Sequence, residues 1–248
     1  MTKRTWIATA AVAALLAWAV PATPAQAYKD RMTPSQGDFM VRILGAAVVP
    51  DTDVDSIRTN GVLTPGADAD VTDAYVPATT LTYFFTPNIA AELFCCVAEH
   101  EIDGEGTFAA LGELAETWIF PPTLTLQYHF TGSRTFKPYL GAGVTYIAFF
   151  DEDVGNGLTG VATGVDIDDA WGFALQAGVD IALGGNWHFN ADVKKIFLNT
   201  DVTWQLAGGG NIVADVDLDP WVFSAGFGYR FHLADLFGGG GARHEPLK

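Results

Sequence analysis

Residues Trp221 to Phe231 read WVFSAGFGYRF, and this stretch decides the fold. Apolar or aromatic residues occupy every second position, with small or polar residues between most of them. A β-strand sends alternate side chains to opposite faces, so one face of this segment is apolar and carries aromatic residues at both ends. About eleven residues is also the length of a tilted strand that crosses a membrane. A soluble sandwich would bury the apolar face, whereas a transmembrane barrel would turn it towards lipid.

The spacing of similar segments along the chain favours the barrel. Eight segments alternate in this way: 38–49, 76–86, 88–98, 120–130, 136–150, 170–182, 187–198 and 220–231. Long and short connections alternate between them without exception. Outer-membrane barrels have short periplasmic turns and long extracellular loops. The sequence therefore predicts an all-β protein, a transmembrane eight-stranded antiparallel up-and-down β-barrel with both ends in the periplasm.

The N-terminus predicts the compartment. Lys3 and Arg4 precede an apolar run from Trp6 to Val20, and Ala25-Gln26-Ala27 has the form of a cleavage site. A secretory signal peptide has this organisation. A membrane anchor helix is disfavoured because the run is short and ends at two prolines. We expect a signal peptide at 1–27, a barrel at 28–231 and a Gly-rich tail at 232–248, with the mature protein in the outer membrane of a Gram-negative bacterium.

Charge is distributed unevenly along the chain. The 13 basic and 29 acidic residues give a formal charge of −16, and removal of the signal peptide leaves about −18, which excludes a nucleic-acid partner. The four long connections hold 22 of the acids and one basic residue, Arg58, so negative charge should face the outside medium. Within the second connection, the composition of Glu105 to Thr117 predicts a short helix. The run Asp51-Thr52-Asp53-Val54-Asp55 begins like a calcium loop but lacks its Gly and Glu, so no metal site or cofactor is predicted; weak binding of divalent cations by these loops stays open.

Several strings in this order resemble the OmpW family of small outer-membrane barrels. They are Pro121-Pro122-Thr123, the segment FKPYLGAGV from Phe136, Trp171-Gly172, Asp219-Pro220-Trp221 and Tyr229-Arg230-Phe231. The resemblance implies an eight-stranded barrel that passes small hydrophobic molecules across the outer membrane, and related barrels are linked to alkane uptake. This chain departs from the family pattern by continuing for 17 residues after Phe231 and by its long, acidic first loop.

The strand phase predicts which side chains face the barrel interior. Near the periplasmic end these include a set of charges, which we expect to pair: Arg42, Glu92, Asp180, Asp192 and Arg230. Near the outer end they form an apolar set: Leu44, Val48, Val76, Phe94, Ile147, Phe149 and Val222. Our hypothesis is a charge-paired plug below an apolar pocket, with a hydrophobic solute entering from above and leaving sideways into the bilayer. The alternative is that these side chains only fill a narrow barrel.

Two other function classes remain. A structural or adhesive barrel would use its acidic loops to touch partners or to bind divalent cations. An enzyme is not predicted because no Ser is placed with a His and an acid, although His100 between Glu99 and Glu101 leaves a protease-like arrangement open. The expected partners are outer-membrane lipid and lipopolysaccharide, small hydrophobic solutes and the barrel assembly machinery.

Overall fold

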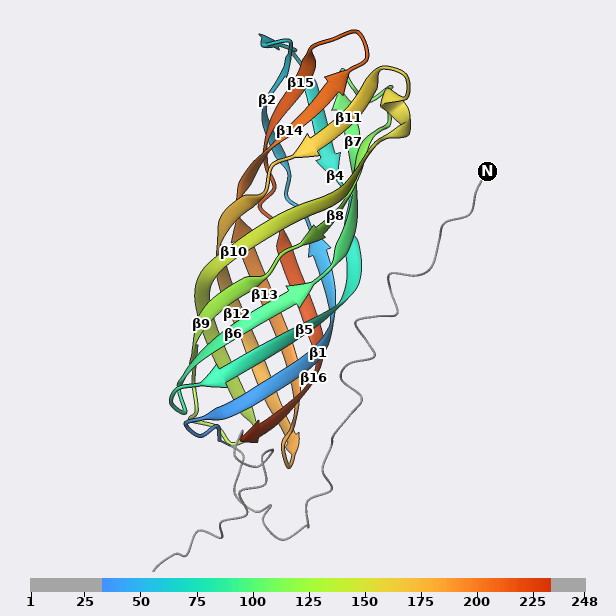
Figure 1. The fold of residues 1–248 in the computed structure, drawn as a ribbon. Coiled ribbons are helices and arrows are strands. Elements are labelled where there is room, and N and C mark those ends of the chain that lie inside the picture. Colours follow the sequence, from blue (N-terminus) through green and yellow to red (C-terminus); the bar gives the residue numbers. More distant parts are fainter. Residues whose placement is uncertain (1–32, 233–248) are drawn as a thin grey trace, which may run out of the picture. The chain divides into compact units, whose positions relative to one another are not determined.

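The computed structural model describes residues 33–232 (Figure 1). The predicted signal peptide at 1–27 lies outside the described residues. Of the predicted tail at 232–248, His232 is described, and it ends the last strand. Residues 33–232 contain no helix that is long and apolar enough to cross a membrane.

Eight strands close into an antiparallel barrel, which confirms the predicted fold. Each strand pairs with the next one along the chain, and the last pairs with the first from Asp38 opposite His232 to Val49 opposite Trp221. The strands are β1 (Asp38–Val49), β5 (Ala74–Phe84), β6 (Ile89–Cys96), β9 (Thr123–His129), β10 (Phe136–Val154), β12 (Ala170–Gly184), β13 (Trp187–Phe197) and β16 (Trp221–His232). The predicted segments agree with these bounds to within a few residues.

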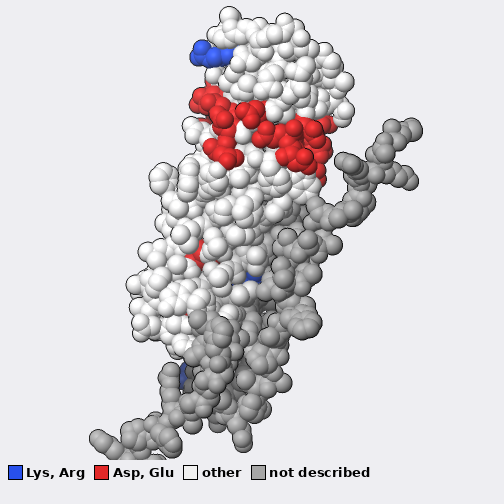
Figure 2. Space-filling model, in the orientation of Figure 1, with Lys and Arg blue, Asp and Glu red and all other residues white. Residues whose placement is uncertain are grey.

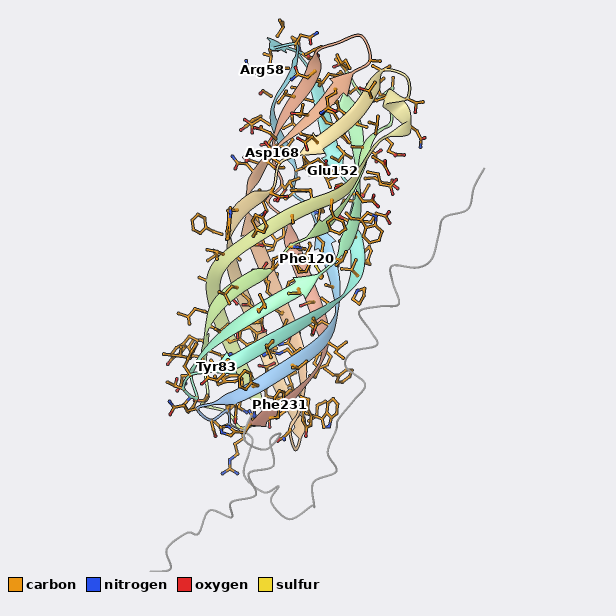
Figure 3. The ribbon with its side chains drawn as sticks, viewed as in Figure 1. Arg58, Tyr83, Phe120, Glu152, Asp168 and Phe231 are labelled. Atoms are coloured by element: carbon orange, nitrogen blue, oxygen red, sulfur yellow. The ribbon has the colours of Figure 1, made fainter. Side chains whose placement is uncertain are left out.

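The outward face of the barrel is apolar, as a lipid-facing surface requires. In β16, Trp221, Phe223, Ala225 and Phe227 are exposed, whereas the residues between them are buried or half-buried. At the inner rim the Phe39 ring stacks on that of Phe231, with ring centroids 5.9 Å apart, and Figure 3 shows Phe231 at this rim. Aromatic pairs such as Tyr146 with Trp171 lie at the other end of the barrel. The alternation in WVFSAGFGYRF therefore identifies the side chains that face lipid.

The long connections continue the barrel outwards as β-structure (Figure 1). One sheet runs in the order β10-β8-β7-β4, and a separate five-stranded sheet runs in the order β11-β14-β15-β2-β3. We call these two sheets the outer extension. Their elements are β2 (Asp53–Thr59), β3 (Val62–Leu63), β4 (Ala67–Val71), β7 (Ala98–Gly106), β8 (Glu113–Phe120), β11 (Ala162–Ile167), β14 (Asn199–Leu206), β15 (Asn211–Asp217) and the 3-10 helix η3 (Asn156–Leu158).

The helix predicted for Glu105 to Thr117 is wrong. This segment is the turn and second strand of the β7–β8 hairpin, in which Ile102 is paired with Ala115. Pairing places Ile102, Leu114 and Ala115 in an apolar cluster of the outer extension. Burial of these side chains outweighs the weak helix preference of the sequence. Gly106 and Gly112 have φ values of 56° and 72°, which favour glycine and allow the tight turn between the strands.

Acidic side chains gather where the outer extension leaves the barrel. Figure 2 shows them as a belt across the face in view, with an almost uncharged surface below. Figure 3 labels Glu152 and Asp168 at this level, well above Tyr83 at the inner rim. We call this feature the acidic belt, and it includes two groups of neighbouring acids: Glu99, Glu116, Asp151 and Asp153, and Glu152, Asp166, Asp168 and Asp169. It lies just above the uncharged surface of the barrel, at the end where the charge distribution along the sequence predicts negative charge.

Candidate functional site in the barrel interior

Arg42 lies at the centre of a buried charge network. Its Nε and Nη2 donate to the two carboxylate oxygens of Asp180 at 3.1 and 2.8 Å, a bidentate pair. Its Nη1 donates to Glu92 Oε2 and Thr82 Oγ1, both at 2.6 Å. These residues come from four strands, and alternation turns each of them inwards. All four are buried, so the paired charges replace the hydration that the interior cannot provide.

A second cation, Lys194, completes the network, and the sequence analysis did not single it out. Its Nζ lies 2.5 Å from Asp192 Oδ1 and 3.4 Å from Glu92 Oε1, so Glu92 bridges the two cations. Gln176 Nε2 donates to Glu92 at 2.8 Å and to Asp192 at 2.7 Å, which links the two acids. Lys194 lies two residues from Asp192 in β13, so both side chains point to the same face of the strand. This alternation is the signal that predicts an inward position for Lys194.

Tyr139 is hydrogen-bonded to the network and packs against β12. Its hydroxyl donates to Asp192 Oδ2 at 2.7 Å, and Asn190 Nδ2 donates to the hydroxyl at 3.0 Å. A Cβ on Gly178 would lie 2.4 Å from this hydroxyl, so only glycine leaves room for the ring. We call the connected group of Arg42, Glu92, Asp180, Asp192, Lys194 and their polar neighbours the charge layer.

Arg230 lies nearer the inner rim than Arg42. It is opposite Met40 in the β1–β16 register, whereas Arg42 is opposite Gly228. Its Nε lies 3.7 Å from Asp38 Oδ2, and His232 Nδ1 lies 3.2 Å from Asp38 Oδ1. Asp38 is an ion-pair partner that the sequence analysis did not identify.

The predicted apolar side chains lie above the charge layer. Leu44, Val48, Phe94, Ile147 and Val222 are buried in one cluster, and Val76 and Phe149 are half-buried against it. We call this group the inner apolar cluster. A second apolar cluster fills the outer extension, and Phe149 and Leu218 pack against both. The apolar interior is therefore continuous from the charge layer into the outer extension.

A cavity lies where the two apolar clusters meet. It has a volume of about 60 Å³. Val48, Ile147 and Phe149 of the predicted set line it, whereas Leu44, Val76, Phe94 and Val222 belong to the cluster without lining it. Loop residues missed by the sequence analysis line the rest, among them Val202, Trp204 and Val216. Within the described residues the lining contains no Asp, Glu, Lys or Arg, and its polar members are Thr52, His100, Thr117 and Thr200.

Strand pairing in the barrel wall is interrupted beside the inner apolar cluster. The β6–β9 ladder ends at Phe94 opposite Thr123, and the β7–β8 ladder resumes in the same register at Ala98 opposite Ile119. Three residues on each side, 95–97 and 120–122, form no ladder pair between them. Pro121 and Pro122 lie in this gap and have no N–H to donate. We call this interruption the proline seam.

The arrangement of His100 with Glu99 and Glu101 differs from that of a catalytic cluster. His100 is buried and faces inwards, whereas both glutamates are exposed on the other face of β7. In residues 33–232 no group of three or more His, Cys, Asp or Glu side chains is arranged to hold a metal ion.

The profile of the OmpW family matches residues 35–231. The chain belongs to the OmpW family. It is 39% identical to the uncharacterized outer-membrane protein y4mB of Sinorhizobium fredii, covering 78% of this chain and 80% of that protein. It is 36% identical to outer membrane protein W of Vibrio cholerae, with coverage of 79% and 89%. The protein is thus an outer-membrane barrel.

Two further relatives and one structure bear on function. The chain is 31% identical to outer membrane protein AlkL of Ectopseudomonas oleovorans (79% of this chain, 84% of AlkL). It is 30% identical to the dibenzothiophene metabolism operon protein PahQ of Pseudomonas aeruginosa (71% and 80%). The crystal structure of OprG from Pseudomonas aeruginosa covers 82% of this chain and 100% of that chain, with a TM-score of 0.77 at 34% identity. The OmpW-family barrel is therefore similar over most of its length to AlkL, PahQ and OprG.

Proposed function

We propose that this OmpW-family barrel admits small hydrophobic molecules from the outside medium and releases them sideways into the outer membrane. The observation that carries the proposal is the abrupt change inside the barrel from a continuous apolar interior to the closed charge layer. Phe94 marks this change, because its ring belongs to the inner apolar cluster and Lys194 Nζ lies 4.6 Å from the ring centroid. An apolar solute that moved further down would break paired charges without replacing them.

The relatives support a hydrophobic solute. PahQ is named for a dibenzothiophene metabolism operon, and dibenzothiophene is an apolar aromatic molecule. The described lining has no charged side chain, so an apolar molecule can pack against it without removing water from a charged group. The acidic belt would also disfavour anions at the entrance.

The proline seam is the proposed exit. Pro122 accepts a hydrogen bond from the N–H of Tyr146 in β10, and successive residues of a strand point their backbone groups to alternate sides. Pro121 therefore faces β6, where its missing N–H leaves the wall without a ladder bond. Cys96, Ala98 and Ile119 flank this point and belong to the inner apolar cluster. Figure 3 shows Phe120 on the barrel wall below the acidic belt, which supports an exit at the level of the lipid.

Restoring the missing donor tests this exit. We expect Pro121→Val to lower the uptake of a radiolabelled apolar compound such as naphthalene several-fold in cells that express the protein. Pro77→Thr is the matched control, because Pro77 lies opposite Gly45 in the unbroken β1–β5 ladder, and it should leave uptake unchanged. Equal amounts of folded protein in the outer membrane are required for the comparison. Unchanged uptake in Pro121→Val would contradict release at the seam.

The acidic belt favours a second candidate, a structural role at the outer surface. In that role the belt would bind neighbouring lipopolysaccharide through divalent cations. Neutralising Asp166, Asp168 and Asp169 as asparagines would then weaken the outer-membrane permeability barrier and leave solute uptake intact. Loss of uptake with an intact barrier would instead favour transport.

A further inference from the structure

We propose that Thr123 and Thr145 are positioning residues of the proline seam: their hydroxyl groups hold the proline segment against β10 and keep it from pairing with β6. The inference rests on the proposed function, because it concerns the exit proposed there. We call the two residues the threonine latch. With the latch in place, the wall stays closed between the segment and β10 and open between the segment and β6.

The threonine latch contacts the carbonyl groups of both prolines. Thr123 lies opposite Thr145 in the β9–β10 ladder, and their hydroxyl oxygens are 2.9 Å apart. Thr123 Oγ1 lies 3.2 Å from the carbonyl oxygen of Pro121, and Thr145 Oγ1 lies 3.4 Å from that of Pro122. The N–H of Tyr146 also donates to the Pro122 carbonyl at 3.1 Å. Since proline has no N–H to donate, side-chain hydroxyls here replace part of the backbone pairing with β10.

The contact of β9 with β10 is tight at this level. Both latch residues are buried in the barrel interior, where a hydroxyl group needs a hydrogen-bond partner. Just below the latch, a Cβ on Gly143 would collide with the carbonyl oxygen of Leu124, so the two backbones approach each other closely. The start of β9 is therefore fixed to β10 both by polar contacts and by packing.

The edge of the segment that faces β6 is different. Within the described part of the chain, residues 95–97 form no ladder pair with residues 120–122. Pro121 faces this gap without an N–H, and its carbonyl oxygen is already in contact with the Thr123 hydroxyl. A carbonyl group in the membrane-spanning wall requires a donor. Without the Thr123 hydroxyl, the donors across the gap are the backbone N–H groups of residues 95–97, and a bond to one of them would close the seam.

NMR of the backbone amides tests the threonine latch directly. We would compare the full-length wild-type protein with Thr123→Val in phosphatidylcholine nanodiscs. In the variant, the Pro121 carbonyl should turn towards β6, so one amide proton among residues 95–97 should shift downfield and exchange more slowly with water. Thr123→Ser keeps the hydroxyl group and should give the wild-type resonances.

Uptake of radiolabelled naphthalene by cells that express the protein relates the threonine latch to the exit. Thr123→Val should lower uptake several-fold at equal amounts of folded protein in the outer membrane, and Thr123→Ser should restore it. Thr145→Val should act in the same direction, because it removes the second hydroxyl of the latch. Thr59→Val is the matched control: its hydroxyl oxygen lies 3.0 Å from that of Thr64 in a threonine pair of the outer extension, and its loss should change neither the amides of 95–97 nor uptake.

The outcomes separate the threonine latch from the proposed function. Unchanged amide resonances of residues 95–97 in Thr123→Val and Thr145→Val would overturn the latch, and release at the seam would still be decided by Pro121→Val. Equal loss of uptake in Thr123→Ser and Thr123→Val would also overturn it, because the hydroxyl group would then not be responsible. Shifted resonances with undiminished uptake would support the latch and contradict release at the seam.

Discussion

Lys194 and Lys195 are consecutive in β13, yet their ammonium groups lie on opposite sides of the barrel wall. Lys194 Nζ is buried between Asp192 and Glu92 in the charge layer. Lys195 Nζ lies 2.9 Å from the exposed carboxylate of Asp51 and 5.1 Å from the ring centroid of Trp221, at the outer edge of the lipid face. One strand thus supplies an internal counter-charge and, one residue later, an interfacial anchor.

This pair makes a direct test of the charge layer. Lys194→Met should destabilise the barrel by about 3–5 kcal/mol, because it leaves Asp192 and part of the charge of Glu92 buried without a cation. Lys195→Met should cost less, about 1 kcal/mol, because the Asp51 carboxylate with which Lys195 pairs is exposed to solvent. Urea unfolding in lipid vesicles, followed by tryptophan fluorescence, measures both values. Equal costs for the two variants would show that the charge layer is not buried as described.

Ion conduction tests whether the charge layer closes the barrel. In a planar bilayer the wild-type protein should carry no large steady current, because Arg42 is bonded to acids on two other strands across the interior. Arg42→Ala should raise the conductance, since the released carboxylates would draw in water and cations. Ile43→Ala, on the lipid face of the same strand, should not. A large wild-type current would contradict the plug.

Phe149 and Phe150 test the apolar route. Phe149 lines the cavity, whereas Phe150 is 43% exposed on the other face. We expect Phe149→Asn to reduce uptake of an apolar compound several-fold, because a polar amide in the lining disfavours an apolar solute. Phe150→Asn should leave uptake close to that of the wild-type protein at equal expression. The reverse order of effects would place the route outside the barrel.

The acidic belt predicts a pH dependence of the outer extension. The pKa of Glu116 is raised, chiefly because it shares a hydrogen bond with Glu99, and also by partial burial and by the nearby charges of Glu99, Asp153 and Asp151. The folded hairpin therefore binds a proton more readily than the unfolded chain. Its stability should increase as the pH falls from neutral towards the ordinary Glu pKa of about 4.3.

Amide hydrogen exchange measures this effect. The β7–β8 amides should be better protected at pH 5 than at pH 7, after correction for intrinsic exchange rates. Glu116→Gln should remove much of the difference, because the amide cannot ionise. Weaker protection at pH 5 in the wild-type protein would contradict the prediction.

Much of the barrel could be predicted because strand periodicity is a local signal. In β16 the exposed Phe223 and the buried Arg230 follow from the alternation alone. The same reasoning placed Arg42, Glu92 and Asp180 in the interior, where the structure brings them into contact. Lys194 was not among the predicted interior charges, although it lies two residues from Asp192 in β13 and therefore points to the same face.

The outer extension was harder to predict because its strands are stabilised by contacts distant in sequence. The segment from Ala98 to Asp103 alternates buried and exposed residues, yet its strand character depends on pairing with β4 and β8. The helix expected for Glu105 to Thr117 failed for this reason. The cavity was also beyond local reasoning, because its wall combines Val48 of β1 with residues such as Trp204 of the fourth long connection.

Photo-crosslinking tests the central claim most directly. An apolar diazirine probe would be added to the outside of intact cells that express the protein, and the labelled residues would be identified by mass spectrometry. We expect labels in the cavity, as at Ile147 and Phe149, and along the proline seam near Cys96 and Phe120. Labels on His188, Lys137 or Arg230, below the charge layer, would show that the solute passes through the barrel to the periplasm and would contradict lateral release.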